Sequence, residues 1–221
     1  MKVSLILFTL NEIDGMKAIM PRIKKEWYDQ LIIVDGGSTD GTIEYAEKNG
    51  HPLFVQKQKG SGAAFREAME KVTGDIAIVF SPDGNSLPEK IPELLEKMKQ
   101  GYDIVIVSRY LDGAKSYDDN IITAFGNWFF TSLINLLFGS KYTDVLVMYR
   151  AYRKDLVRLL GVATNNNSWG SLMLIRATKN KLKIGEIPGD EPARIGGKQK
   201  MNPLTYGFRE LKAILKEFLI I

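Results

Sequence analysis

The sequence predicts an α/β fold, in which a mostly parallel sheet carries helices on both faces. Short apolar runs typical of buried strands alternate along residues 3–107 with segments of helical periodicity. Strands separated by helices of roughly 10–15 residues indicate βαβ units and a parallel sheet. Polar and Gly-rich segments follow these strands, and ligands of such sheets bind at the carboxyl ends of the strands. We therefore expect a binding site along one edge of the sheet.

The first half of the chain supplies most of the expected elements. Strands are expected at residues 3–8, 31–34, 53–55, 75–80 and 103–107. Helices are expected at residues 14–26, 41–48, 62–71 and 88–99. In the second half we expect a strand or extended segment at 144–152, a helix at 168–179 and a strand at 182–187.

Residues 121–140 are free of charged side chains. A transmembrane helix is one interpretation, since about 20 apolar residues span a bilayer. Two internal glycines and several polar side chains favour the other, a helix half-buried in the fold and half facing lipid or an apolar ligand. The polar residues are Thr123, Asn127, Thr131, Ser132 and Asn135.

An amphipathic helix is expected at residues 203–221, after a domain that covers residues 1–202. Phe208, Leu211, Leu215 and Phe218 form one apolar stripe on this helix. The stripe has two interpretations, packing on the domain or lying on a membrane surface.

Composition is that of a soluble globular protein of 221 residues, with 45% hydrophobic and 25% charged residues and no cysteine. Disulfides and thiolate chemistry are therefore excluded. Residues 172–221 hold 10 Lys/Arg and 5 Asp/Glu, a net charge of +5, whereas residues 1–171 have a net charge of −1. Phosphate ligands or an anionic membrane surface explain this asymmetry better than nucleic acid, for which we find no motif.

Asp35 ends an apolar strand and is followed by Gly36 and Gly37. Glycines allow the backbone to approach a flat ligand closely, and the Asp35 carboxylate can accept hydrogen bonds from a base or a ribose. Thr39 or Asp40 can cap the helix that follows. An ordinary strand-to-helix loop is the alternative.

Six segments together resemble the family-2 glycosyltransferases of the GT-A fold, and within them the dolichyl-phosphate mannose or glucose synthases. The resemblance covers roughly residues 1–215, and it depends on the order and spacing of the segments. They lie at residues 9–12, 35–40, 59–64, 81–85, 108–110 and 194–200.

The resemblance implies a site for a nucleotide sugar, either GDP-mannose or UDP-glucose. The helix start around Gly62 offers N–H groups that suit phosphates. A basic, Gly-containing loop can close over the diphosphate. The residues expected to contact the nucleotide sugar are Thr9, Asn11, Glu12, Asp35, Gly62, Asp83, Arg194 and Lys200.

The resemblance also implies a metal ion, Mg²⁺ or Mn²⁺. Asp83 stands where the D-x-D motif of the family ends, and Asn85 stands where a Gln commonly helps to ligate. The first acidic position of that motif is Ser81 here. Mg²⁺ often binds through one or two carboxylates plus phosphates, so Asp83 and Asn85 are the expected ligands.

Asp83, Asp144 and Arg109 are the expected catalytic residues. Arg109 suits an acceptor phosphate, and Asp144 would either orient Arg109 or serve as a base; orientation is favoured. A polyprenyl phosphate is already ionised near pH 7 and needs no base. The basic residue that lipid-phosphate synthases usually offer before the charge-free helix is absent, because residues 118–120 read Asp-Asp-Asn.

The expected function is therefore inverting transfer of a hexose from a nucleotide sugar to a polyprenyl (dolichyl) phosphate, by an enzyme bound peripherally at the cytoplasmic face of a membrane. One alternative is an enzyme of the same fold that acts on a soluble or polysaccharide acceptor and needs an essential carboxylate. The other is a non-catalytic nucleotide-sugar binder, suggested by Ser81. A nucleotidyltransferase is disfavoured, because residues 9–14 are neither Gly-rich nor basic.

Overall fold

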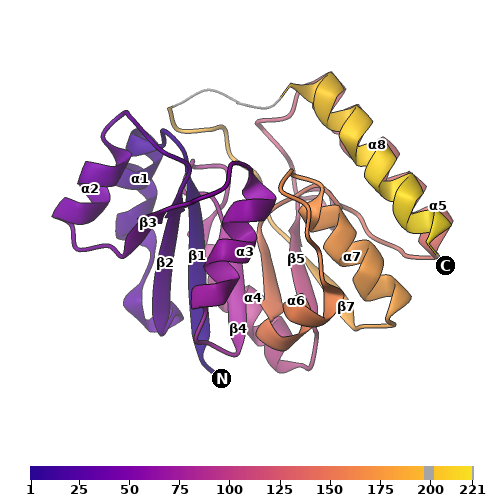
Figure 1. Ribbon diagram of the computed structural model, residues 1–221, viewed down its shortest axis with the longest axis horizontal. Coiled ribbons are helices and arrows are strands. Elements are labelled where there is room, and N and C mark those ends of the chain that lie inside the picture. Colours follow the sequence, from indigo (N-terminus) through magenta and orange to yellow (C-terminus); the bar gives the residue numbers. More distant parts are fainter. Residues whose placement is uncertain (197–201, 221) are drawn as a thin grey trace.

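The computed structural model describes residues 1–196 and 202–220, and it contains a seven-stranded sheet with the order β3-β2-β1-β4-β6-β5-β7 (Figure 1). All neighbouring strands run parallel except at β6, which is antiparallel to both β4 and β5. The strands are β1 Val3–Thr9, β2 Gln30–Asp35, β3 Leu53–Val55, β4 Ile76–Phe80, β5 Ile104–Ser108, β6 Arg150–Arg153 and β7 Ile184–Pro188.

Helices cover both faces of the sheet, as predicted. One core cluster joins α3, α5, α6, α7 and α8 to the sheet, and a second joins α1, α2 and α4 to the opposite face. The helices are α1 Ile13–Ile19, α2 Thr42–Lys48, α3 Ser61–Lys71, α4 Ile91–Lys99, α5 Ile121–Phe138, α6 Lys154–Leu160, α7 Trp169–Lys179 and α8 Pro203–Leu219.

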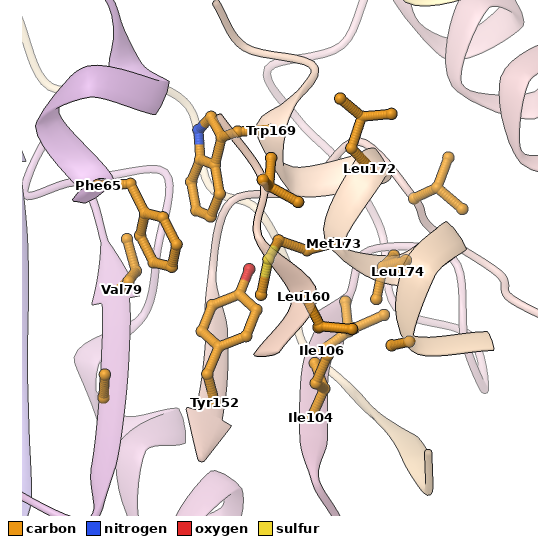
Figure 2. Packing of buried hydrophobic residues seen from close by; sticks show 14 of the residues in the cluster. Phe65, Val79, Ile104, Ile106, Tyr152, Leu160, Trp169, Leu172, Met173 and Leu174 are labelled. Carbon is orange, nitrogen blue, oxygen red and sulfur yellow. The ribbon is translucent and has the colours of Figure 1, made fainter. Parts of the chain in front are cut away.

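Side chains that alternate along the strands between the two faces of the sheet build these two cores. In β1, Ile6 and Phe8 join the first cluster, whereas Leu5 and Leu7 join the second, and all four are buried. Parallel strands buried on both faces require such continuous apolar runs. Figure 2 shows the first cluster, in which Phe65 stacks on Trp169 with ring centroids 4.1 Å apart.

Three elements differ from the sequence-based expectation. The helix expected at 14–26 ends at Ile19, because Pro21 lies in the 3₁₀ turn Met20–Arg22 that follows. The segment expected to be extended at 144–152 forms a strand only from Arg150, and that strand is antiparallel. Helix α6, Lys154–Leu160, was not predicted; it is short and ends at Gly161, which has φ +56°.

Helix α5 is the charge-free segment. Asn120 caps its start by accepting hydrogen bonds from the N–H groups of Ile122 and Thr123, and Gly139 ends it in the left-handed conformation. Its length and composition would suffice to cross a membrane, but core helices of soluble proteins can pass the same test. Only 22% of this segment is fully buried within the fold, while Leu133, Leu137 and Phe138 pack partly buried against the first core cluster.

Helix α8 packs on the body of the protein through a face that the stripe did not predict. Its buried residues are Glu210, Ile214 and Glu217, and it contacts α5 and α7 (Figure 1). Ile214 joins the first core cluster, while Arg176 Nε donates to Glu217 at 2.9 Å.

The expected apolar stripe of α8 lies largely outside. Phe208 is 72% exposed, Leu215 44% and Phe218 45%, while Leu211 is partly buried against the core. The interpretation in which the stripe packs on the domain is therefore confirmed for Leu211 and in part for Phe218, whose ring contacts Phe138 of α5 edge-on, whereas Phe208 and Leu215 lie largely outside. Exposed apolar residues of α5 and α8 form what we call the α5–α8 surface, consisting of Ile121, Ile122, Phe125, Trp128, Phe129, Leu136, Leu204, Phe208, Leu215, Phe218 and Leu219.

Candidate functional site

One cavity of about 1010 Å³ lies where the strands end. The register brings Thr9 beside Asp35 and Leu7 beside Phe80, so the segments that follow β1, β2 and β4 meet at one edge of the sheet. The cavity is lined by residues from all three of these regions and also from the segments after β5 and β7. Its position agrees with the expectation for ligand sites of parallel sheets.

Asp35 is fully buried and organises the loop after β2. Its Oδ1 accepts hydrogen bonds from the N–H groups of Gly37 at 2.8 Å and Ser38 at 2.6 Å. Its Oδ2 accepts from the hydroxyls of Thr9 at 2.8 Å and Ser38 at 2.6 Å. In this structure the carboxylate therefore holds the loop in place, and Thr9 and Gly36, rather than Asp35, line the cavity.

Asn11 holds the same loop from the other side. It has φ +53°, and its Oδ1 accepts a hydrogen bond from the N–H of Thr39 at 2.8 Å. Its own N–H donates to Ser38 Oγ at 2.8 Å. The neighbouring Glu12 lines the cavity and is 7% exposed. Segments 9–12 and 35–40 thus form one hydrogen-bonded unit.

The N-terminus of α3 is covered by another loop. The N–H of Gly62 donates to the carbonyl oxygen of Asn165 at 3.1 Å, so the expectation of an exposed donor at Gly62 is wrong. A Cβ at Gly60 would lie 2.0 Å from that same oxygen, and one at Gly62 would lie 2.2 Å from the carbonyl oxygen of Thr164. These glycines therefore admit the backbone of residues 164–166, whereas Lys59, Gly60 and Ser61 line the cavity.

Asp83 and Asn85 follow β4 and line the cavity. Burial raises the pKa of the Asp83 carboxyl, while the positive charge of Arg194 opposes that shift. Asn85 donates its side-chain N–H to Asp118 at 2.8 Å, and its backbone N–H to Asp83 at 3.1 Å. Asn85 Oδ1 is buried with no hydrogen-bond partner among the described residues.

Arg194 joins two of the expected site residues that are far apart in sequence. Its Nη1 donates to both oxygens of Glu12 at 3.0 and 3.2 Å, and its Nη2 donates to Asp83 at 2.8 Å. The backbone N–H of Ile195 also donates to the carbonyl oxygen of Asp83 at 2.8 Å. Lys200, the other expected cation of this loop, lies outside the described residues.

Arg109 is held by acidic residues at the end of β5. Its Nε and Nη2 donate to the two oxygens of Asp144 at 2.7 and 2.9 Å, and its Nη1 donates to Glu191 at 3.1 Å. The charge of Asp144 raises the pKa of Arg109 even though burial alone would lower it. Asp144 is fully buried and pairs with Arg109. This is the geometry expected of a residue that orients the Arg109 side chain.

One part of the cavity lining is apolar. Ile122, Phe125 and Phe129 of α5 line it, together with Leu204 and Gly207 at the start of α8. The same cavity is therefore lined both by acidic and basic groups that follow the strands and by residues of the α5–α8 surface.

Comparison with known proteins agrees with this arrangement. Glycosyl transferase family 2 matches residues 4–161, which is more than half of the chain. The chain belongs to this glycosyltransferase family. A dolichol-phosphate mannosyltransferase of Pyrococcus furiosus is 30% identical to it over 224 residues, which cover 93% of this chain and 60% of that one. The chain thus spans about three fifths of the length of this relative.

A second relative of this family-2 glycosyltransferase is an undecaprenyl-phosphate mannosyltransferase of Micrococcus luteus. The two are 28% identical over 216 residues, which cover 91% of this chain and 88% of the relative. Glucosyl-3-phosphoglycerate synthase from Mycobacterium tuberculosis, solved with Mn²⁺, UDP-glucose and phosphoglyceric acid, has a TM-score of 0.75 and 19% identity, covering 98% of this chain and 79% of its own. This similarity confirms the predicted GT-A fold.

The family-2 site also contains residues that sequence reasoning missed. Glu191 lines the cavity and contacts Arg109, and burial raises the pKa of its carboxyl. Asp119 lines the cavity as well, 3.7 Å from Arg109. Glu191 lies three residues beyond strand β7, so its place after a strand end was the signal that could have found it.

Proposed function

We propose that this glycosyltransferase moves a hexose from GDP-mannose or UDP-glucose to a polyprenyl phosphate, with inversion at the anomeric carbon. The observation that carries the proposal is one cavity that is lined both by the charged side chains Glu12, Asp83 and Arg194 and by residues of α5 and α8. A charged donor and a lipid acceptor need these two environments side by side. The names of the relatives support the same acceptor class.

At the donor end, the nucleotide would lie against the unit formed by segments 9–12 and 35–40. Thr9 and Glu12 face the cavity there, while Asp35 and Asn11 keep the loop in shape. Gly62 would act through the packing of α3, since its N–H is used within the protein. Arg194 and Lys200 are proposed as the cations that meet the diphosphate.

A metal ion is proposed to bind with the donor. Asp83 supplies a carboxylate, and Asn85 supplies a buried oxygen that has no hydrogen-bond partner within residues 1–196 and 202–220; both suit the oxygen preference of Mg²⁺ or Mn²⁺. The described residues contain no group of three or more acidic or His side chains placed to hold a metal, so phosphate oxygens would complete the set. Such an ion would offset the negative charge that develops on the departing diphosphate.

At the acceptor end, Arg109 is proposed to position the acceptor phosphate. Asp144 keeps the guanidinium in a fixed orientation through two hydrogen bonds and has no exposed surface of its own. A phosphate acceptor is a nucleophile that is already ionised, so no general base is required. The buried Asp144 is then a positioning group and Arg109 the contact.

The α5–α8 surface is proposed to lie on the cytoplasmic face of a membrane. Trp128 of α5 is 63% exposed, and Leu204 and Phe208 of α8 are 83% and 72% exposed. Exposed patches of this kind mark sites of protein or membrane contact. Arg209, Lys212 and Lys216 on the same helix add positive charge that would favour anionic lipids.

One observation favours a second candidate acceptor, a soluble molecule with a hydroxyl nucleophile. Glu191 lines the cavity with a raised pKa, which is the property of a general base or acid. The mycobacterial synthase of similar fold was solved with phosphoglyceric acid. Under this alternative, Glu191→Gln would abolish transfer, whereas transfer to a polyprenyl phosphate would not need its proton-accepting capacity.

Radiolabelled transfer tests the proposal. Purified protein is incubated with labelled GDP-mannose or UDP-glucose and with polyprenyl phosphate, with and without EDTA, and label is counted in the lipid phase. We expect label in the lipid, and at least a tenfold loss, about 1.4 kcal/mol of transition-state stabilisation, in Asp83→Ala and in Arg194→Ala. Transfer at the wild-type rate in both variants would refute the site, and label confined to water-soluble products would favour the second acceptor class.

A further inference from the structure

We infer that Arg194 is a built-in counter-ion that keeps a divalent cation off Asp83 until a nucleoside diphosphate is present. The inference rests on the proposed donor site, and it adds the order in which the nucleoside diphosphate and the metal ion bind there. It starts from the guanidinium, which lies between Glu12 and Asp83 and donates to both. Both carboxylates are buried, with exposed fractions of 7% and 6%.

The loop that carries Arg194 is docked on the metal-binding segment by more than its charge. Ile195 donates its N–H to the carbonyl oxygen of Asp83, and its side chain lies against Gly84, where a Cβ would be only 2.6 Å from Ile195 Cγ1. Gly196 lies beside Asp14, whose Oδ2 would be 2.7 Å from an added Cβ. Residues 194 and 195 therefore fit closely against the loop after β4, and Gly196 fits against Asp14 of α1.

The arrangement makes the guanidinium and a metal ion compete for one carboxylate. Asp83 Oδ2 accepts from Arg194 at 2.8 Å, and Asp83 Oδ1 accepts from the N–H of Asn85 at 3.1 Å. A divalent ion on Asp83 would stand beside the positive charge of Arg194 and would break its ion pair. Breaking a buried pair without compensation is strongly unfavourable.

A nucleoside diphosphate removes that obstacle. Its phosphates offer Arg194 a new anionic partner with which a guanidinium can form two hydrogen bonds. They also supply oxygen ligands to the metal, for which Asp83 and Asn85 offer few. The buried Nε of Arg194 has no partner among the described residues, so one donor of the group is not yet used. Metal and nucleotide should therefore bind with positive coupling.

Binding of Mn²⁺ alone tests the inference without any turnover. Free Mn²⁺ is measured by electron paramagnetic resonance during titration of wild type, Arg194→Gln and Arg194→Lys. We expect Arg194→Gln to bind Mn²⁺ at least about tenfold more tightly than wild type, and Arg194→Lys to fall between them. Arg22→Gln, which removes an exposed pair with Glu89, is the matched control and should leave Mn²⁺ affinity unchanged.

Two further measurements locate the effect. Adding Asp83→Asn to Arg194→Gln should abolish the gain in Mn²⁺ affinity, because the carboxylate for which Arg194 and the metal compete is lost. With saturating UDP or GDP, the advantage of Arg194→Gln over wild type should disappear, since Arg194 then has the diphosphate as partner. Circular dichroism and thermal melting confirm folding, and Arg194→Lys, which keeps the charge, serves if the Gln variant does not fold.

Equal Mn²⁺ affinity in wild type and both Arg194 variants, including no measurable binding in any of them, would overturn the inference. The result is separable from the proposed function. Failure of lipid labelling with a tenfold gain in Mn²⁺ affinity would refute the acceptor but leave the competition intact. Normal lipid labelling with no gain in Mn²⁺ affinity would refute the competition and leave the proposed acceptor intact.

Discussion

Asp144 and Arg109 form a bidentate pair, in which Nε and Nη2 of the guanidinium reach the two carboxylate oxygens at 2.7 and 2.9 Å. The carboxylate is fully buried and the arginine side chain is 11% exposed. The pair joins the end of β5 to the segment that precedes β6, so the Arg109 side chain is fixed before any acceptor arrives.

Asp144→Asn should destabilise the protein by about 3 kcal/mol, the lower end of the range for removing one partner of a buried ion pair, because Glu191 still contacts the Arg109 guanidinium. Glu89→Gln is the matched control: its pair with Arg22 is about half exposed and is worth about 0–1 kcal/mol. Urea unfolding of both variants measures the difference. Equal losses would show that Asp144 is not a structural partner of Arg109.

Gly60→Ala should displace the loop 164–166 and lower stability by about 1–3 kcal/mol, since Gly60 has φ +108° and a Cβ there would meet Asn165. Gly126→Ala, in helix α5 with no atom within 4 Å of its Cβ, should instead raise stability by about 0.5–1 kcal/mol. Thermal unfolding compares the two. A neutral Gly60→Ala would contradict the close packing of this loop on α3.

Glu210→Gln should change how stability depends on pH. Burial raises the pKa of this carboxyl above its ordinary value of 4.5, so its contribution is fully present below that value and is lost as pH rises through the folded-state pKa. Wild type should therefore lose stability relative to Glu210→Gln between acidic and neutral pH. Each unit of raised pKa corresponds to about 1.4 kcal/mol. Urea titrations at several pH values measure the gap, and a gap independent of pH would contradict the assignment.

Trp128 should report membrane contact. It is 63% exposed on α5, whereas Trp169 is 3% exposed in the core. We expect the emission of the protein to shift to shorter wavelength on addition of anionic vesicles, and the shift to vanish in Trp128→Phe. A variant that replaces Phe208 and Leu219 with Gln should reduce sedimentation with the same vesicles. An unchanged spectrum together with unchanged sedimentation would remove the membrane proposal.

The sheet could be predicted because its signals are local. Strand β3 was predicted at its observed bounds, and β1, β2, β4 and β5 within one residue at either end. Strand β6 inserts antiparallel between β4 and β5, and short-range periodicity carries no information about such a crossing. The subdivision into residues 1–202 and 203–221 stays a prediction, although Ile214 of α8 packs in the first core cluster.

The site was predictable where its residues follow strands and unpredictable where distant segments meet. Glu12 and Arg194 lie 182 positions apart, and neither segment shows that the two will pair. The apolar stripe on α8 could be seen in the sequence, but the face of α8 that packs against the protein could not be predicted from it. Glu217 and Glu210 decide that side through Arg176 and Ser171 of α7, which the periodicity of α8 alone cannot reveal.

The α5–α8 surface has a consequence for when, during synthesis of the chain, the protein could attach to a membrane. Its two helices are separated by the whole of β6, α6, α7 and β7, yet they contact one another in the finished fold. A polypeptide emerging from the ribosome therefore cannot present the complete α5–α8 surface until α8 has been synthesised. Attachment to a bilayer through this complete surface would therefore require that all seven strands of the sheet have already been synthesised.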